Sequence, residues 1–101
     1  LDALRAAAYP VHMAAMRPRL LACYQRRLAT TPTLEGQITF TLQFAPSGAV
    51  STPQPVAGAP ATTLDDAELT ACAVSALRGL RLPRSLPDII PHTQPIVFRL
   101  R

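Results

Sequence analysis

Apolar side chains recur at steps of three and four residues along the first third of the chain, a spacing typical of an amphipathic helix. The residues of this stripe between positions 3 and 29 are Met13, Met16, Leu20, Cys23, Tyr24 and Leu28. Pro10 and Pro18 interrupt the segment, because proline cannot donate the hydrogen bond of an interior helical residue. We therefore expect a short leading helix and a main helix from about residue 17.

The hydrophobic period changes to two in QITFTLQF, residues 37–44. The apolar positions there are Ile38, Phe40, Leu42 and Phe44. Strict alternation predicts a strand with one buried face and one wet face. The APSG that follows predicts a tight turn, with Gly48 at the position that needs positive φ.

The chain then returns through AVSTPQPVA, residues 49–57, which predicts a weaker second strand. Pro53 and Pro55 cannot donate ladder hydrogen bonds, so we expect this strand to lie at an edge of the sheet.

A second helical pattern occupies LDDAELTACAVSALRGL, residues 64–80, with Asp65 as the expected N-cap and Glu68 completing a capping box. Its apolar stripe consists of Leu69, Cys72, Ala73, Ala76, Leu77 and Leu80. Four prolines in residues 81–95 predict an irregular crossover. Alternation resumes in IVFRLR, residues 96–101, which predicts a third strand that ends at the last residue.

The order helix, strand, strand, helix, strand predicts an α+β fold in which two helices pack on one face of a three-stranded antiparallel sheet. We expect the proline-free strand 37–44 at the centre, which gives the spatial order two, one, three. The 101 residues, of which 49% are hydrophobic, suit one domain over residues 1–101. Because the chain begins at Leu1 rather than Met, we expect it to be a piece of a longer protein. No apolar run in it has the length of a membrane span or signal peptide.

In this layout Cys23 and Cys72 both point into the core from neighbouring helices and can meet. A disulfide between them would close a loop of roughly 50 residues and add roughly 4 kcal/mol of stability. It would also imply an oxidising compartment such as the periplasm or an extracellular space. Two reduced, buried thiols are the main alternative, and a metal site with His12 and His92 is a weaker one, because the spacing of structural zinc ligands is lacking. We favour the disulfide.

The net charge of +4 comes from ten arginines, no lysine and six acidic residues. The arginines that gather on the first helix are Arg17, Arg19, Arg26 and Arg27. We interpret them as a solvated helical face, with phosphate contact as the alternative. The phenylalanines of the strands share the core-facing positions, so the sheet should not present the exposed aromatics of an RNA-binding surface, and we expect no nucleic-acid partner.

Catalysis is not expected. His12 and His92 lie in or beside proline-broken segments, and neither has a serine or an acid in a recognisable relation to it. We accordingly expect no catalytic residue, no metal, no cofactor and no small-molecule substrate.

Two stretches that cover nearly the whole chain resemble a known family. In CYQRRLATTPTLEGQITFTLQFAPSGAV, a Cys-Tyr pair on a helix is followed by a Pro-x-Leu-x-Gly loop, an alternating strand and a glycine turn. LDDAELTACAVSALRGLRLP is similar to the second half of the same pattern, a capped helix with one cysteine. The family is the TonB-like C-terminal domain, and specifically the cysteine-paired branch of the myxobacterial envelope and gliding-motility proteins AgmX and PglI. The chain departs from it at Leu82, where the family has an aromatic residue before proline, and in its proline-rich second strand.

The resemblance implies a non-enzymatic periplasmic module at the end of an inner-membrane protein, reached through a membrane anchor and a proline-rich spacer. Such a module couples an inner-membrane motor or anchor complex to an outer-membrane or envelope protein, in force or energy transduction, often through an added β-strand.

An unpaired edge strand offers free N–H and C=O groups to an extended peptide. We expect the partner-binding residues to be those of the third strand, namely Ile96, Val97, Phe98, Arg99, Leu100 and Arg101. Arg99 and Arg101 would attract an acidic peptide. The alternatives are an ordinary edge whose arginines discourage aggregation, and a domain that dimerises by edge pairing. We favour the receiver of a foreign strand.

Overall fold

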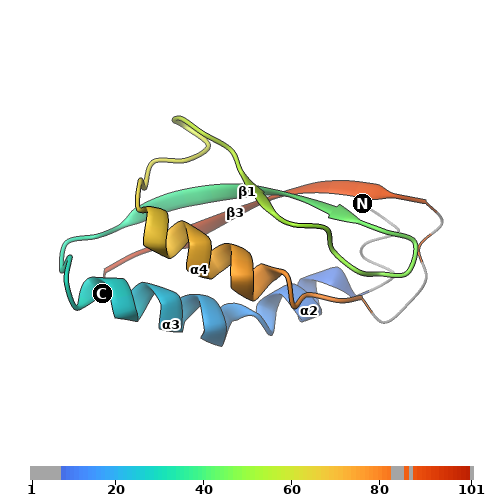
Figure 1. Ribbon diagram of the computed structural model, residues 1–101, viewed down its shortest axis with the longest axis horizontal. Coiled ribbons are helices and arrows are strands. Elements are labelled where there is room, and N and C mark those ends of the chain that lie inside the picture. The colour runs from blue at the N-terminus through green and yellow to red at the C-terminus, as the bar shows by residue number, and fades with distance from the viewer. Residues whose placement is uncertain (1–7, 83–85, 87, 101) are drawn as a thin grey trace.

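The computed structural model describes residues 8–82, 86 and 88–100. Its elements follow the order α2 (Tyr9–Ala14), α3 (Arg17–Leu28), β1 (Gly36–Phe44), β2 (Gln54–Pro55), α4 (Ala67–Leu77) and β3 (Ile90–Phe98). The three strands form an antiparallel sheet in the order β2-β1-β3. Helices α3 and α4 lie side by side on one face of it (Figure 1). The α+β fold with strand order two, one, three is therefore confirmed.

The N-terminal helical segment divides as its prolines predict. Both α2 and α3 carry a proline within their first two positions, Pro10 and Pro18. A proline there costs little, because the first N–H groups of a helix have no intrahelical partner. The division places α2 next to β3, where the ring of Tyr9 packs edge-on against His92 at 4.7 Å. His92 thus lies within a strand rather than in a loop.

Helix α4 begins one residue later than expected. Its N-cap is Asp66, whose carboxylate accepts a hydrogen bond of 2.8 Å from the N–H of Leu69, so the assignment of Asp65 was wrong. Two adjacent aspartates are equivalent in a sequence pattern. The structure separates them because Arg27 of α3 reaches Asp66 and holds it in the capping position.

The core lies between the sheet and the two long helices. From β1 it takes the four alternating apolar residues, which are at most 2% exposed. The helices contribute the predicted stripes, including Leu20, Cys23 and Tyr24 of α3 and Leu69 of α4. All three phenylalanines are buried, so within the described residues the sheet presents no exposed aromatic ring that could stack on a base.

Strand β3 begins six residues earlier than expected and ends sooner. It starts at Ile90, so the prediction of an irregular crossover up to residue 95 was wrong, and it ends at Phe98. Its nine residues pair with β1 from Gly36 opposite Phe98 to Phe44 opposite Ile90. Pro91 and Pro95 fit into this strand because each stands where the backbone nitrogen is not needed for pairing with β1.

The edge of β1 that faces away from β3 is covered by the short β2 and by the loop that follows it. In this loop the hydroxyl groups of Thr62 and Thr63 accept hydrogen bonds from the β1 backbone, as the carbonyls of a neighbouring strand would. The Oγ1 atom of Thr63 accepts from the N–H of Gln37 at 3.0 Å, and that of Thr62 accepts from the N–H of Thr39 at 3.2 Å. This flank of β1 is therefore occupied within the chain.

Candidate partner-binding edge

The direction of the backbone groups in β3 follows from the bonds of β1. The N–H of Val56 donates to the carbonyl of Thr39 at 2.8 Å, and that of Ser51 donates to the carbonyl of Gln43 at 2.9 Å. The odd-numbered residues of β1 thus face β2, and the even-numbered ones face β3, because alternate residues of an antiparallel strand bond to opposite sides.

The register then fixes which residues of β3 point away from the sheet. Each residue of β3 lies opposite a residue of β1 of the same parity, for example Ile96 opposite Ile38. The outward-facing residues are therefore Pro91, Thr93, Pro95 and Val97. All four are exposed. Only Thr93 and Val97 have an N–H group, so the outer edge of β3 has two donors for its four carbonyls.

One of those four carbonyls already accepts a hydrogen bond from a side chain. The Nε2 atom of Gln94 donates to the carbonyl of Pro95 at 3.0 Å, and its Oε1 accepts from the hydroxyl of Tyr9 at 2.8 Å. Burial raises the pKa of Tyr9 to about 12, so this hydroxyl keeps its proton under physiological conditions. The chain of bonds from α2 thus occupies the Pro95 carbonyl and leaves Thr93 and Val97 as the outward residues whose N–H and C=O groups are both free of a partner among the described residues. Of these two, only Val97 also lines the groove described next.

A groove of about 610 Å³ lies between the helices and the second half of β3. Met13 of α2 and Leu20 and Leu21 of α3 form its helical wall, and Ile96 and Val97 belong to its strand wall. Leu21 is 39% exposed and Val97 is 49% exposed, so both leave apolar surface accessible at this groove. The groove therefore combines apolar surface with an open strand edge.

The charged residues of this groove are basic. Arg17 at the start of α3 and Arg99 after β3 both line it, and both are exposed. No acidic side chain belongs to its lining in the part of the chain that the structure describes. Arg17 and Arg99 thus favour an anionic or carboxylate-bearing ligand where they line the groove. Of the other arginines of α3, Arg19 and Arg26 are solvated, whereas Arg27 is paired with Asp66.

The structure separates the six residues expected to bind a partner. Ile96 and Phe98 face β1 with their backbones, and their side chains are buried in the core, 9% and 5% exposed. Val97 alternates with them and faces outward. Arg99 and Leu100 follow the strand, and the N–H of Leu100 donates to Glu35 at 3.3 Å. Arg101 lies outside the described residues.

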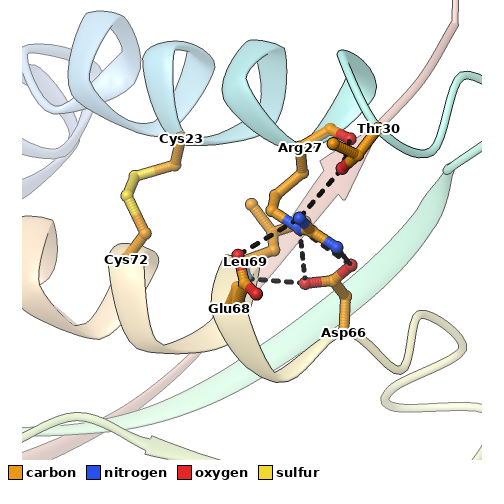
Figure 2. A network of polar contacts seen from close by, with 7 residues as sticks. All are labelled: Cys23, Arg27, Thr30, Asp66, Glu68, Leu69 and Cys72. Atoms are coloured by element: carbon orange, nitrogen blue, oxygen red, sulfur yellow. Dashed lines mark hydrogen bonds and ion pairs between the residues drawn. A yellow bond between two sulfur atoms is a disulfide. The ribbon is translucent and has the colours of Figure 1, made fainter.

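The predicted disulfide is present. Cys23 and Cys72 are bonded, with their Cα atoms 5.8 Å apart, and the bridge joins α3 to α4 across a sequence separation of 49 (Figure 2). The bridge therefore fixes the helix that forms one wall of the groove against the helix behind it.

A second connection between α3 and α4 lies near the end of the same helix pair (Figure 2). The guanidinium of Arg27 contacts Asp66 at 3.1 Å, Glu68 at 3.1 Å and the hydroxyl of Thr30 at 3.0 Å. The hydrogen bond from Arg27, followed by that from the Leu69 N–H, holds the pKa of Asp66 below its ordinary value. Covalent and ionic contacts thus hold α3 at two points.

Sequence reasoning missed the helical wall of the groove and the role of Gln94. Leu21 carries the one available signal, because it is a large apolar residue beside the buried stripe rather than in it. The contact between Tyr9 and Gln94 spans 85 residues, and no local pattern indicates it.

A second hollow, of about 630 Å³, lies on the other side of the molecule between the loop after β2 and the start of α4. Its lining includes Val56, Leu64 and Ala71. The strand edge beside it is the two-residue β2, so it lacks the long ladder that β3 offers.

Comparison with solved structures supports the fold. Over 86% of this chain and 82% of the other, the structure is similar to the solution structure of the Helicobacter pylori TonB-CTD, with a TM-score of 0.55 and 15% sequence identity. The fold is thus that of a TonB C-terminal domain. Neither a protein-family model nor a curated protein sequence matches the chain. Within residues 8–82, 86 and 88–100, no helix has the length and apolar composition needed to cross a membrane.

Proposed function

We propose that the chain is a non-enzymatic, periplasmic interaction module that binds an extended segment of an envelope or outer-membrane protein by β-strand addition at the outer edge of β3. The observation that carries the proposal is the position of Val97. Its backbone faces outward, its side chain is half exposed, and it lies beside a groove that α2 and α3 complete.

Strand addition uses two sources of binding energy, main-chain hydrogen bonds and alternate side chains that enter pockets. An added strand beside Val97 would turn every second side chain toward the groove formed by Met13, Leu20 and Leu21. Arg17 and Arg99 flank that position. The partner segment should therefore combine apolar residues at every second position with a nearby carboxylate.

The proposed location rests on the bond between Cys23 and Cys72, because disulfides persist in oxidising compartments such as the bacterial periplasm. The fold supports the same assignment by its similarity to the Helicobacter pylori TonB-CTD. We further propose that the domain is attached to an inner-membrane motor or anchor complex through a preceding part of the protein. Force or energy would then reach the envelope partner through it.

A role in gliding motility, as in the AgmX and PglI branch, is the finer form of this proposal. The feature that supports it is the pair of cysteines placed on the two helices, which the resemblance to that branch includes. Transport across the outer membrane would use the same edge and the same groove.

The experiment that tests the function is a crosslinking pull-down from envelope extracts with the wild-type domain, Val97→Pro and Val97→Thr. Val97→Pro removes one outward N–H, at the kind of position where β3 already contains Pro91 and Pro95. Val97→Thr keeps the N–H and the branched shape. We expect one envelope protein to crosslink through an extended segment to the wild type and to Val97→Thr, and to be lost with Val97→Pro. Equal capture by all three would contradict strand addition.

A further inference from the structure

Proline stands at outward-facing positions of both edge strands. In β2, Gln54 lies opposite Thr41 and faces β1, so its neighbour Pro55 faces outward. In β3, Pro91 and Pro95 face outward. A residue that faces outward would otherwise present an N–H group to a passing strand, so each of these prolines removes a donor from an exposed edge.

The edge at Pro95 is restricted twice. Its nitrogen carries no hydrogen, and its carbonyl accepts the hydrogen bond from Gln94, which Tyr9 in turn orients from α2. Thr93 is consequently isolated between two prolines. After Val97, in contrast, the next residue at the same alternate spacing is Arg99, which has a backbone N–H.

We propose that Pro91, Pro95 and Gln94 determine the specificity of this edge: they prevent β3 from pairing with the β3 of a second copy, and they restrict a foreign strand to Val97 and the residues after it. The second half of this statement rests on the proposed function. The first half does not depend on it.

The possible alignments of two β3 strands show why β3 pairs poorly with the β3 of a second copy. In an antiparallel pair of identical strands centred on Thr93, Pro91 of each copy lies opposite Pro95 of the other, and neither residue can donate. In a pair centred on Pro95, the Pro95 residues of the two copies lie opposite each other, and they offer two carbonyls and no N–H donor. Any alignment that uses the whole strand loses half of its donors in this way, because two of the four outward residues of β3 are prolines.

The restriction to Val97 agrees with the position of the groove. The strand residues that line it begin at Gln94 and continue to Leu100, whereas Pro91 and Thr93 do not belong to its lining. A strand that pairs with Val97 thus gains side-chain contacts, while one that pairs only with Thr93 gains neither a continuous ladder nor an apolar wall.

The first test is sedimentation velocity over a range of protein concentrations with the wild type and Pro91→Thr/Pro95→Thr. Threonine restores both donors and favours a strand. We expect self-association of the double variant to be at least about tenfold stronger than that of the wild type, the effect of roughly one net hydrogen bond. Pro32→Thr, at an exposed turn, is the matched control and should behave as the wild type. A double variant that associates no more than the wild type would overturn the first half of the proposal. If it does not fold, Pro95→Thr alone supplies the same comparison.

The second test compares Thr93→Pro with Val97→Pro in capture of the envelope partner. The proposal predicts that Thr93→Pro changes capture less than twofold, whereas Val97→Pro abolishes it. Equal loss with both variants would overturn the restriction to Val97 while leaving strand addition intact. Loss with neither would instead contradict the proposed function.

Discussion

At the scale of single residues, Asp66 takes part in two different polar contacts of the fold. Its carboxylate caps α4 through the Leu69 N–H and receives the guanidinium of Arg27 from α3. The ion pair with Arg27 requires the ionised form, and the hydrogen bond from the Leu69 N–H is stronger to it, because a charged acceptor makes a stronger hydrogen bond than a neutral one. The residue therefore links helix formation to helix packing through one charge.

We expect Asp66→Asn to change the pH dependence of stability. The pKa of Asp66 is lowered in the folded state, so its contribution is present above the unfolded-state pKa of about 3.9 and is lost as the pH falls through the lower folded-state pKa. Asparagine still caps a helix but loses the charge interaction with Arg27. In urea titrations the variant should be less stable than the wild type at pH 7, and the difference should shrink in acid. A difference that is the same at both pH values would contradict the role of the charge.

At the scale of elements, β3 shows that a strand can contain prolines where their backbone nitrogens face away from the neighbouring strand. We expect His92→Pro to destabilise the domain by about 2 kcal/mol or more, because the N–H of His92 faces Leu42 of β1 and its loss leaves a ladder carbonyl unpaired. Thr93→Pro, one residue along, should cost about 1 kcal/mol or less, because Thr93 faces outward. Urea unfolding of the two variants measures the difference. Equal costs would show that the register of β3 is misassigned.

An element can be predicted from the sequence when the polarity of its residues matches their burial in the fold. Residues 37–44 alternate cleanly and were predicted within one residue, because burial of β1 requires apolar side chains at every second position. Residues 90–95 were missed because the residues facing the helices there include His92 and Gln94, which are polar and half-buried beside Tyr9. Their polarity hides the alternation, and the prolines between them indicate a loop until the outward direction of each is known.

The candidate site likewise has one part that the sequence predicted and one part that it did not. Val97 and Arg99 were predicted from alternation and charge, since both properties are local. The groove was not, because Met13, Leu21 and Ile96 come together only when α2 and α3 pack on the sheet. A surface built from three elements has no signature in any one of them.

At the scale of the whole molecule, the disulfide and the Arg27 network hold α3 against α4, and α3 supplies a wall of the groove (Figure 2). We expect Cys23→Ala/Cys72→Ala to lower stability by about 4 kcal/mol, which corresponds to roughly 15 °C or more in Tm for a domain of this size. Thermal unfolding followed by circular dichroism measures it. Adding a reductant should bring the wild type to the same Tm and leave the variant unchanged. An unaltered Tm in both cases would contradict the structural role of the bridge.

The open edge is also a property of the whole molecule, since the other flank of β1 is closed by β2 and by Thr62 and Thr63 within the same chain. The most direct measurement of the central claim is amide hydrogen exchange of Val97 in the full domain, with and without its captured envelope partner. In the free domain the Val97 amide should exchange rapidly, as an outward-facing group without a partner. In the complex its exchange should slow by at least about tenfold, while that of an inward-facing amide such as Ile96 changes little. An unchanged exchange rate at Val97 in a fully saturated complex would show that the partner binds without joining the sheet.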